Sequence, residues 1–101
     1  MNIAIAAGSD YNSAVSAKNN SSHRVDVTGN SDQLLRLLDE RRYEKVVLDF
    51  SLVDIGFLRK LAGQYNGTLA LYNVGVSNTT NIEEACRGMN LRYVRSATDG
   101  I

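Results

Sequence analysis

The clearest pattern in the chain is an uninterrupted apolar run near its middle. Val46, Val47 and Leu48 follow one another without a polar residue, and Asp49 stands at the carboxyl end of the run. A continuous apolar run is typical of a strand that is covered on both faces, because none of its side chains meets water. We therefore predict that residues 44–50 form the central strand of a parallel sheet, with helices above and below it.

Four further segments have the pattern of strands. Residues 2–7, 68–74 and 91–94 are short and mainly apolar, whereas 24–28 alternates between polar and apolar positions. Alternation is typical of an edge strand or of a strand with one half-exposed face. The sequence therefore predicts five strands, with 24–28 at an edge of the sheet.

The helix expected after residue 30 has the strongest local signals. Its leucines occupy an arc of roughly 160° when successive residues are placed about 100° apart. Asn30, with Gln33 three positions later, resembles a capping box. Arg41 and Arg42 stand near the predicted carboxyl end, where the negative pole of a helix favours positive charge.

Three other apolar stripes predict helices over 11–18, 57–65 and 80–89. Gly67 provides a left-handed stop after the second of these helices, and Cys86 lies on the apolar stripe of the third, where we expect it in the core. Strands and helices that alternate through short connections predict a parallel α/β sheet with right-handed crossovers. All of it fits one domain over residues 1–101.

Composition narrows the class of protein. Lys plus Arg and Asp plus Glu number 11 each, so the chain lacks the basic excess that nucleic-acid binding requires. Its apolar runs are far shorter than the roughly 20 residues that cross a bilayer. The first residues lack the pattern of a signal peptide, and one cysteine cannot form an internal disulfide. We therefore expect a cytoplasmic protein without membrane insertion.

Aspartates carry the candidate chemistry. Asp49 ends the central strand, Asp10 follows the first strand, and Asp54 comes five residues after Asp49. Ligands of open parallel sheets gather at the carboxyl ends of the strands, and three carboxylates there would be candidate ligands for Mg²⁺. The simpler interpretation is that these aspartates cap the following helices and stay solvated, because acidic residues favour helix amino ends. With no nucleophile–base pair and no glycine-rich loop, we expect neither an enzyme nor a cofactor.

Three stretches of the chain match a known family. Residues 46–49 match a strand that ends in a phosphoacceptor, 56–61 match the glycine and leucines that follow it, and 84–95 match the end of a helix and a last strand. Together they resemble the receiver domains of bacterial two-component signalling over nearly the whole chain. The resemblance implies a three-layer, flavodoxin-like fold with strand order 2-1-3-4-5, and it places the phosphoacceptor position at Asp49.

Several positions depart from that family. Receivers carry two adjacent acidic residues directly after the first strand, where residues 6–9 are Ala-Ala-Gly-Ser and Asp10 comes late. Asn73 stands where the family has Thr or Ser, and Arg95 is the nearest match to its Lys. The family's fifth helix is missing, since only seven residues, 95–101, follow the last strand. The resemblance therefore implies a degenerate receiver that is not phosphorylated.

An atypical receiver implies a protein partner. That partner would be an output domain or an ATPase in a longer chain, as in the pilus-assembly localisation proteins, although this chain has no Walker loop of its own. A missing fifth helix also predicts partly exposed apolar side chains beside the helix at 11–18, and either a homodimer or docking on a following domain through that face.

Two other functions remain open. One is a receiver that accepts a phosphoryl group on Asp49. The other is a STAS-type anti-sigma-factor antagonist, because residues 46–51 also resemble the core strand of the sulfate-transporter/anti-sigma-antagonist family. That second alternative requires a β-hairpin at the amino terminus.

Overall fold

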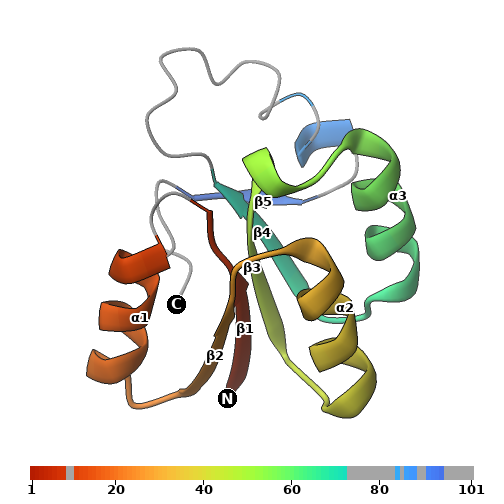
Figure 1. Ribbon diagram of the computed structural model, residues 1–101. Helices are drawn as coiled ribbons and strands as arrows, with labels where there is room; N and C mark the ends of the chain where they lie inside the picture. The colour runs from red at the N-terminus through yellow and green to blue at the C-terminus, as the bar shows by residue number, and fades with distance from the viewer. Residues whose placement is uncertain (9–10, 73–83, 85, 89–90, 95–101) are drawn as a thin grey trace.

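One parallel sheet organises the molecule (Figure 1). The computed structural model describes residues 1–8, 11–72, 84, 86–88 and 91–94. The strands are β1 (Asn2–Ala6), β2 (Arg24–Thr28), β3 (Lys45–Asp49), β4 (Thr68–Tyr72) and β5 (Arg92–Tyr93). Their order in the sheet is β2-β1-β3-β4-β5, and every pair is parallel. This is the flavodoxin-like order expected from the sequence, with β3 central and β2 at an edge.

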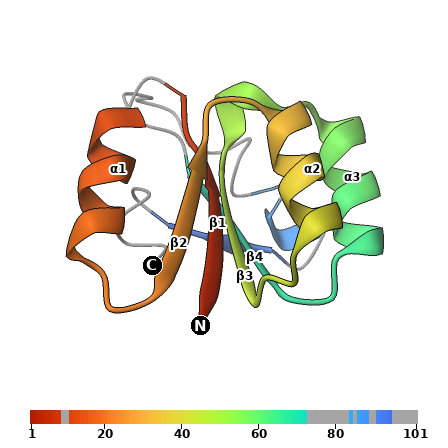
Figure 2. The same cartoon turned by 60° about the horizontal axis from the view of Figure 1, so that its bottom comes forward.

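The helices cover both faces of the sheet. They are α1 (Tyr11–Asn20), α2 (Ser31–Glu40) and α3 (Ile55–Gln64), and one 3₁₀ turn, η1 (Phe50–Leu52), follows β3. Figure 2 shows α1 on one face and α2 with α3 on the other, which makes three layers. Residues 84 and 86–88 are helical as well, where the fourth helix is predicted.

Each face of the sheet has its own apolar core. Val46 and Leu48 of β3 belong to the core under α2 and α3, and Val47 belongs to the core under α1. Successive residues of a strand point to opposite faces, and all three side chains are fully buried because helices cover both faces. Cys86 is buried in the α2–α3 core, as predicted.

Helix α2 begins as predicted and ends earlier than predicted. The Asn30 side chain accepts a hydrogen bond from the backbone N–H of Gln33 at 2.8 Å, which satisfies one orphan donor of the first turn. The last helical residue is Glu40, and Arg41 is already extended. The two arginines therefore lie beyond the last turn, which contains no basic residue.

Gly67 has a different role from the predicted left-handed stop. Its φ lies outside the left-handed region, and Tyr65, in an extended conformation, ends α3. A Cβ at residue 67 would stand 2.6 Å from the carbonyl oxygen of Glu44 and would collide with the hydroxyl of Tyr65. Glycine is needed here because backbone and side chain approach it closely, and its unusual φ range is not used.

The α1 face is buried at its central strands and partly exposed at its margin. The strand side chains Ile3, Ile5 and Val47 on this face are fully buried, while Tyr11 on α1 is 41% exposed. Ala14 of α1 is small and fully buried, so the helix lies close to the strands and shields them. Tyr11 of α1 and Val27 of β2 keep apolar side chains partly exposed on this face, as the sequence predicts, although the strand residues directly under the helix are buried.

Some predictions fall on residues that the structure does not describe. Asp10, Asn73 and Arg95 are among them, as are the last two residues of the segment predicted as strand at 68–74 and the residues after Val94, where the fifth helix is expected to be missing. In the described part of the chain, no helix has the length and apolar character needed to cross a membrane. Strands β1 and β2 pair in parallel, so the amino-terminal hairpin that a STAS-type domain requires is not the arrangement of residues 2–28.

Candidate functional site

Asp49 occupies the carboxyl end of the central strand, as the sequence predicts. It pairs in register with Tyr72 of β4, and β1 runs on its other side. The side chain is almost completely buried, with 1% of its surface exposed. Asp49 therefore ends the central strand, as the sequence predicts, but it does not face open solvent.

Both oxygens of the Asp49 carboxylate already accept hydrogen bonds. Oδ1 accepts from the backbone N–H of Ser51 at 2.9 Å and from the Ser51 hydroxyl at 2.8 Å. Oδ2 accepts from the backbone N–H of Gly8 at 3.1 Å. Burying a carboxylate is costly unless donors compensate it, and these three donors supply that compensation. The capping hypothesis is confirmed, because Asp49 caps η1, but the expectation that this side chain stays solvated is wrong.

Gly8 brings the end of β1 directly against this carboxylate. A Cβ on residue 8 would stand 2.7 Å from Asp49 Oδ2 and 3.2 Å from Ser51 Oγ, closer than real side chains pack. Only glycine allows the backbone N–H to reach the carboxylate without displacing it. This part of the chain therefore contributes a hydrogen-bond donor to the carboxylate.

Asp54 is used locally in the same way. Its Oδ1 accepts from the backbone N–H of Phe57 at 2.7 Å, and this bond caps α3. The Mg²⁺ hypothesis needed Asp49, Asp54 and Asp10 together, and Asp10 lies outside the described residues. Among the residues that are described, no group of three His, Cys, Asp or Glu side chains is placed to hold a metal ion.

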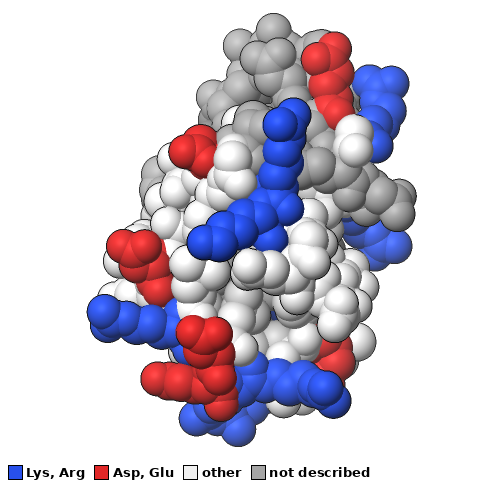
Figure 3. All heavy atoms as spheres, turned by 90° about the vertical axis from the view of Figure 1, so that its right-hand side faces the viewer, with Lys and Arg blue, Asp and Glu red and all other residues white. Residues whose placement is uncertain are grey.

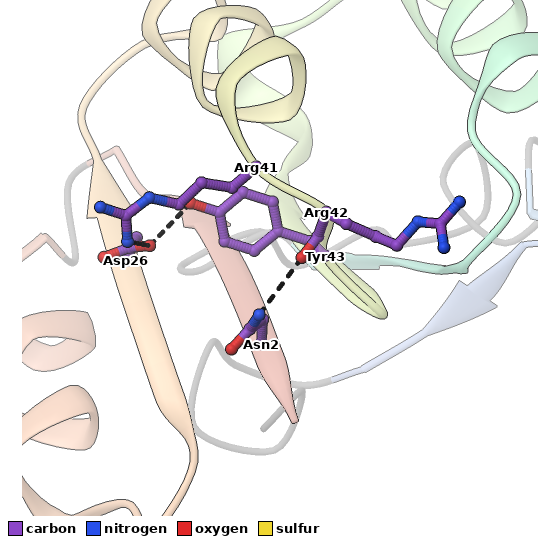
Figure 4. Close-up of polar contacts among 5 residues, drawn as sticks. All are labelled: Asn2, Asp26, Arg41, Arg42 and Tyr43. Carbon is purple, nitrogen blue, oxygen red and sulfur yellow. Dashed lines mark hydrogen bonds and ion pairs between the residues drawn. The ribbon is translucent and has the colours of Figure 1, made fainter.

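A second polar cluster lies at the opposite, amino-terminal edge of the sheet (Figure 4). The Tyr43 hydroxyl donates to Asp26 Oδ2 at 2.6 Å, and Arg41 Nη1 lies 3.8 Å from the same oxygen. Burial, and then the hydrogen bond to Asp26, raise the pKa of Tyr43 well above its usual range. Asn2 Nδ2 donates to the carbonyl oxygen of Arg42 at 3.3 Å, so the turn after α2 is tied to both β1 and β2.

Tyr65 extends this cluster to the next turn. Its hydroxyl donates to the carbonyl oxygen of Tyr43 at 2.8 Å. Burial, with a smaller contribution from Glu44, raises the pKa of Tyr65 to about 12. The backbone N–H of Asn2 donates to Glu44 and holds the pKa of that carboxyl below its usual value, so Glu44 stays charged. The turns that precede β3 and β4 are thus fastened to each other.

A groove of about 670 Å³ opens beside these turns. It is formed by residues from 35–44, at the end of α2 and the following turn, and from 61–67, at the end of α3. A second hollow of about 530 Å³ lies toward β5 and shares Tyr65 and Gly67 with the first. No local sequence pattern predicted this edge of the sheet as a site. The available signal was Tyr43, an aromatic residue placed in an otherwise charged turn.

Comparisons with known proteins support the fold but give no information about the site. No family model matches the chain, and no curated protein matches it. A solved structure described as a response regulator receiver protein from Burkholderia phymatum superimposes with a TM-score of 0.72 over 94% of this chain and 82% of that one, at 16% identity. A likeness at that identity shows the fold alone. The chain therefore has the receiver-like, flavodoxin-like fold.

Proposed function

We propose that this chain is an atypical receiver-like domain that works by binding another protein and that Asp49 does not serve it as a phosphoacceptor. The observation that supports the proposal is the Asp49 carboxylate, which is buried and accepts hydrogen bonds from Gly8 and Ser51 on both oxygens. An internally satisfied carboxylate has a structural role, and the molecule loses that role if the carboxylate is modified.

Phosphoryl transfer makes two demands that the described residues meet poorly. The attacking oxygen must approach the phosphorus in line, and a metal ion with positioned donors must offset the charge that develops. Attack by Asp49 Oδ2 would first require the Gly8 N–H to withdraw. The stretch before Asp10 supplies Ala7 and Gly8 where a receiver would supply carboxylates for the metal.

The partner in this proposal is a protein, either a separate polypeptide, a second copy, or an output domain in a longer chain. The supporting observations are the receiver-like fold, whose two faces are covered by helices, and a formal net charge of zero, which adds little repulsion to a protein contact. A genuine phosphoacceptor at Asp49 is the second candidate, because the residue ends the central strand as it does in receivers.

Intact-mass measurement separates these two candidates. After incubation with acetyl phosphate and Mg²⁺, we expect the mass of the protein to stay unchanged. The Asp49→Ala variant and the Asp54→Ala variant serve as a pair, since the first removes the candidate acceptor and the second removes an exposed cap. A gain of one phosphate that disappears with Asp49→Ala and persists with Asp54→Ala would refute the proposal.

A further inference from the structure

The turn between α3 and β4 consists of an asparagine followed by a glycine. Tyr65 ends α3 and Thr68 begins β4, so Asn66 and Gly67 belong to neither element. Both residues are exposed. Figure 3 faces the side on which α3 lies, and charged side chains of both signs gather at its lower end, where α3 ends. Water therefore has access to this turn.

An asparagine side chain can react with the backbone of the residue after it. The backbone nitrogen of that residue attacks Cγ, a five-membered succinimide ring closes, and the proton of the nitrogen leaves with the side-chain amide group as ammonia. Water then opens the ring on either side of the nitrogen. Cleavage of the bond to Cγ gives aspartate, and cleavage of the bond to the backbone carbonyl carbon gives isoaspartate. A glycine in the second position favours the attack, because it has no side chain to crowd the nitrogen, and Asn66 is the one asparagine of the sequence that glycine follows.

Both reacting groups of this pair are free of competing hydrogen bonds. Neither the Gly67 N–H nor the Asn66 side-chain amide bonds to any residue that the structure describes. The N–H groups on either side are engaged, since that of Tyr65 donates to α3 at 2.8 Å and that of Thr68 donates to the carbonyl oxygen of Glu44 at 3.0 Å. Adjacent groups that no other bond restrains are the ones that react readily within a chain.

Two comparable asparagines of the described chain are held in place. Asn20 and Asn30 each precede a serine, whose side chain already crowds the nitrogen. The N–H of Ser21 donates to the carbonyl oxygen of Lys18 at 3.3 Å, so the nucleophile next to Asn20 is engaged. The side chain of Asn30 accepts a hydrogen bond from Gln33 at 2.8 Å as the cap of α2. Of these three asparagines, Asn66 is therefore the one whose surroundings permit the reaction.

We propose that Asn66 is a site of deamidation in the folded chain and that its isoaspartate product weakens the connection between β3 and β4. Isoaspartate carries the main chain through Cβ and Cγ, so it adds one backbone atom between Tyr65 and Gly67. The reaction needs only water and releases ammonia. The inference goes beyond the proposed function and does not depend on it.

The turn has little room for an additional backbone atom. The Tyr65 hydroxyl is bonded to the carbonyl oxygen of Tyr43, and the Thr68 N–H is bonded to that of Glu44. Between these two bonds, a Cβ on Gly67 would already stand 2.6 Å from the Glu44 carbonyl oxygen and would collide with the Tyr65 hydroxyl. A longer main chain must therefore displace one of the two hydrogen bonds that join this turn to the turn before β3.

Incubation in ¹⁸O-labelled water tests the site. The folded chain is kept at mildly alkaline pH in labelled water and is then digested in ordinary water, so that product formed during digestion carries no label. Tandem mass spectrometry with electron-based fragmentation locates the products and distinguishes the isomers. We expect labelled aspartate and labelled isoaspartate at position 66 before either appears at Asn20 or Asn30.

Two variants separate the reaction from its effect. Asn66→Gln keeps an exposed amide but would have to close a six-membered ring, so it is expected to yield no product at position 66. Asn66→Asp introduces the charge of the product without the additional backbone atom. The purified isoaspartate form is expected to unfold at a lower urea concentration than both the parent chain and Asn66→Asp. Its amide signals are expected to shift at 43–45 and 65–68.

Four results would overturn the inference. The first is labelled product at Asn20 or Asn30 before Asn66, and the second is aspartate alone at position 66, because ring opening gives both isomers. The third is an isoaspartate form as stable as Asn66→Asp. The fourth is an unreacted Asn66 in the folded chain when the same chain in urea reacts there, since the folded turn would then protect it. The acetyl phosphate experiment is independent of all four, so either proposal can fail without the other.

Discussion

At the scale of single residues, the contact between Gly8 and Asp49 determines the environment of the buried carboxylate. The two lie far apart in the sequence, and the Gly8 N–H reaches Asp49 Oδ2 at 3.1 Å because nothing stands between the backbone and the carboxylate. Local sequence patterns predict that an aspartate at a strand end caps the next turn, and Asp49 does so through Ser51. They say nothing about the third donor, Gly8, since it lies just after a different strand and far away in the sequence.

The Gly8→Ala substitution tests that contact. The new methyl group would stand 2.7 Å from Asp49 Oδ2, and either the carboxylate or the end of β1 must shift. We expect the free energy of unfolding to fall by about 1–3 kcal/mol, measured by urea denaturation. Gly63→Ala is the control, because a methyl group there meets nothing within 4 Å and lies near the end of α3. It should be neutral or stabilise by up to about 1 kcal/mol. Equal losses in both variants would contradict the argument.

At the scale of elements, the ends of the helices show which local signals are reliable. The amino-terminal caps of α2 and α3 follow from Asn30 and Asp54, whose side chains bond the first turns. The carboxyl ends are harder to predict. Arg41 leaves the end of α2 for Asp26 on β2, and Tyr65 ends α3 because its hydroxyl reaches the turn before β3. Both depend on partners that are distant in sequence.

The two ends of α2 provide a matched electrostatic test. Asp39 lies in the last turn, close to the negative pole of the helix, and Asp32 lies in the first turn, close to the positive pole. At low salt, Asp39→Lys is expected to stabilise the protein by about 0.3–1 kcal/mol, and Asp32→Lys to destabilise it by a similar amount. Urea denaturation measures both, and high salt should shrink both differences. The same sign for both substitutions would count against this description of α2.

The hydrogen bond from the Tyr65 hydroxyl to the Tyr43 carbonyl oxygen joins the turns before β3 and β4, and Tyr65 predicts that the free energy of unfolding depends on pH. Folding raises the pKa of Tyr65 from its ordinary value of 10.0 to about 12. The folded state therefore holds its proton more tightly, and this contribution to stability is complete below pH 10 and is lost as the pH rises from 10 to 12. In Tyr65→Phe, urea denaturation should show a flatter decline over that pH range. An identical decline in both proteins would exclude this assignment.

At the scale of the whole molecule, one sheet joins two cores. Ile5 of β1 belongs to the core under α1, whereas Leu48 of β3 belongs to the core under α2 and α3. The sheet order could be predicted because the apolar run of β3 and the alternation of β2 leave few other arrangements. The groove could not, because it is made by the ends of two helices and two turns that meet only in three dimensions.

Because the cores share the strands, we expect them to unfold together. Ile5→Val should cost about 0.5–1.5 kcal/mol and Leu48→Ala about 2–5 kcal/mol. Each should move the urea midpoint without changing the slope of the transition. Circular dichroism and tyrosine fluorescence report on backbone and side chains respectively, and their transitions should coincide in both variants. Separate transitions in either variant would show that the two layers unfold independently.

If the proposed function holds, the hydrogen bond between Gly8 and Asp49 has a consequence for how long a response of this domain lasts. A phosphoryl group on a receiver persists until it is hydrolysed, so a phosphorylated receiver responds for some time after the phosphorylation event. In the proposed function, the Asp49 carboxylate accepts hydrogen bonds from Gly8 and Ser51 and is not phosphorylated, so no phosphorylated state persists. The response of the domain then follows the concentration of its partner at each moment. Its duration is set by the dissociation rate of the complex.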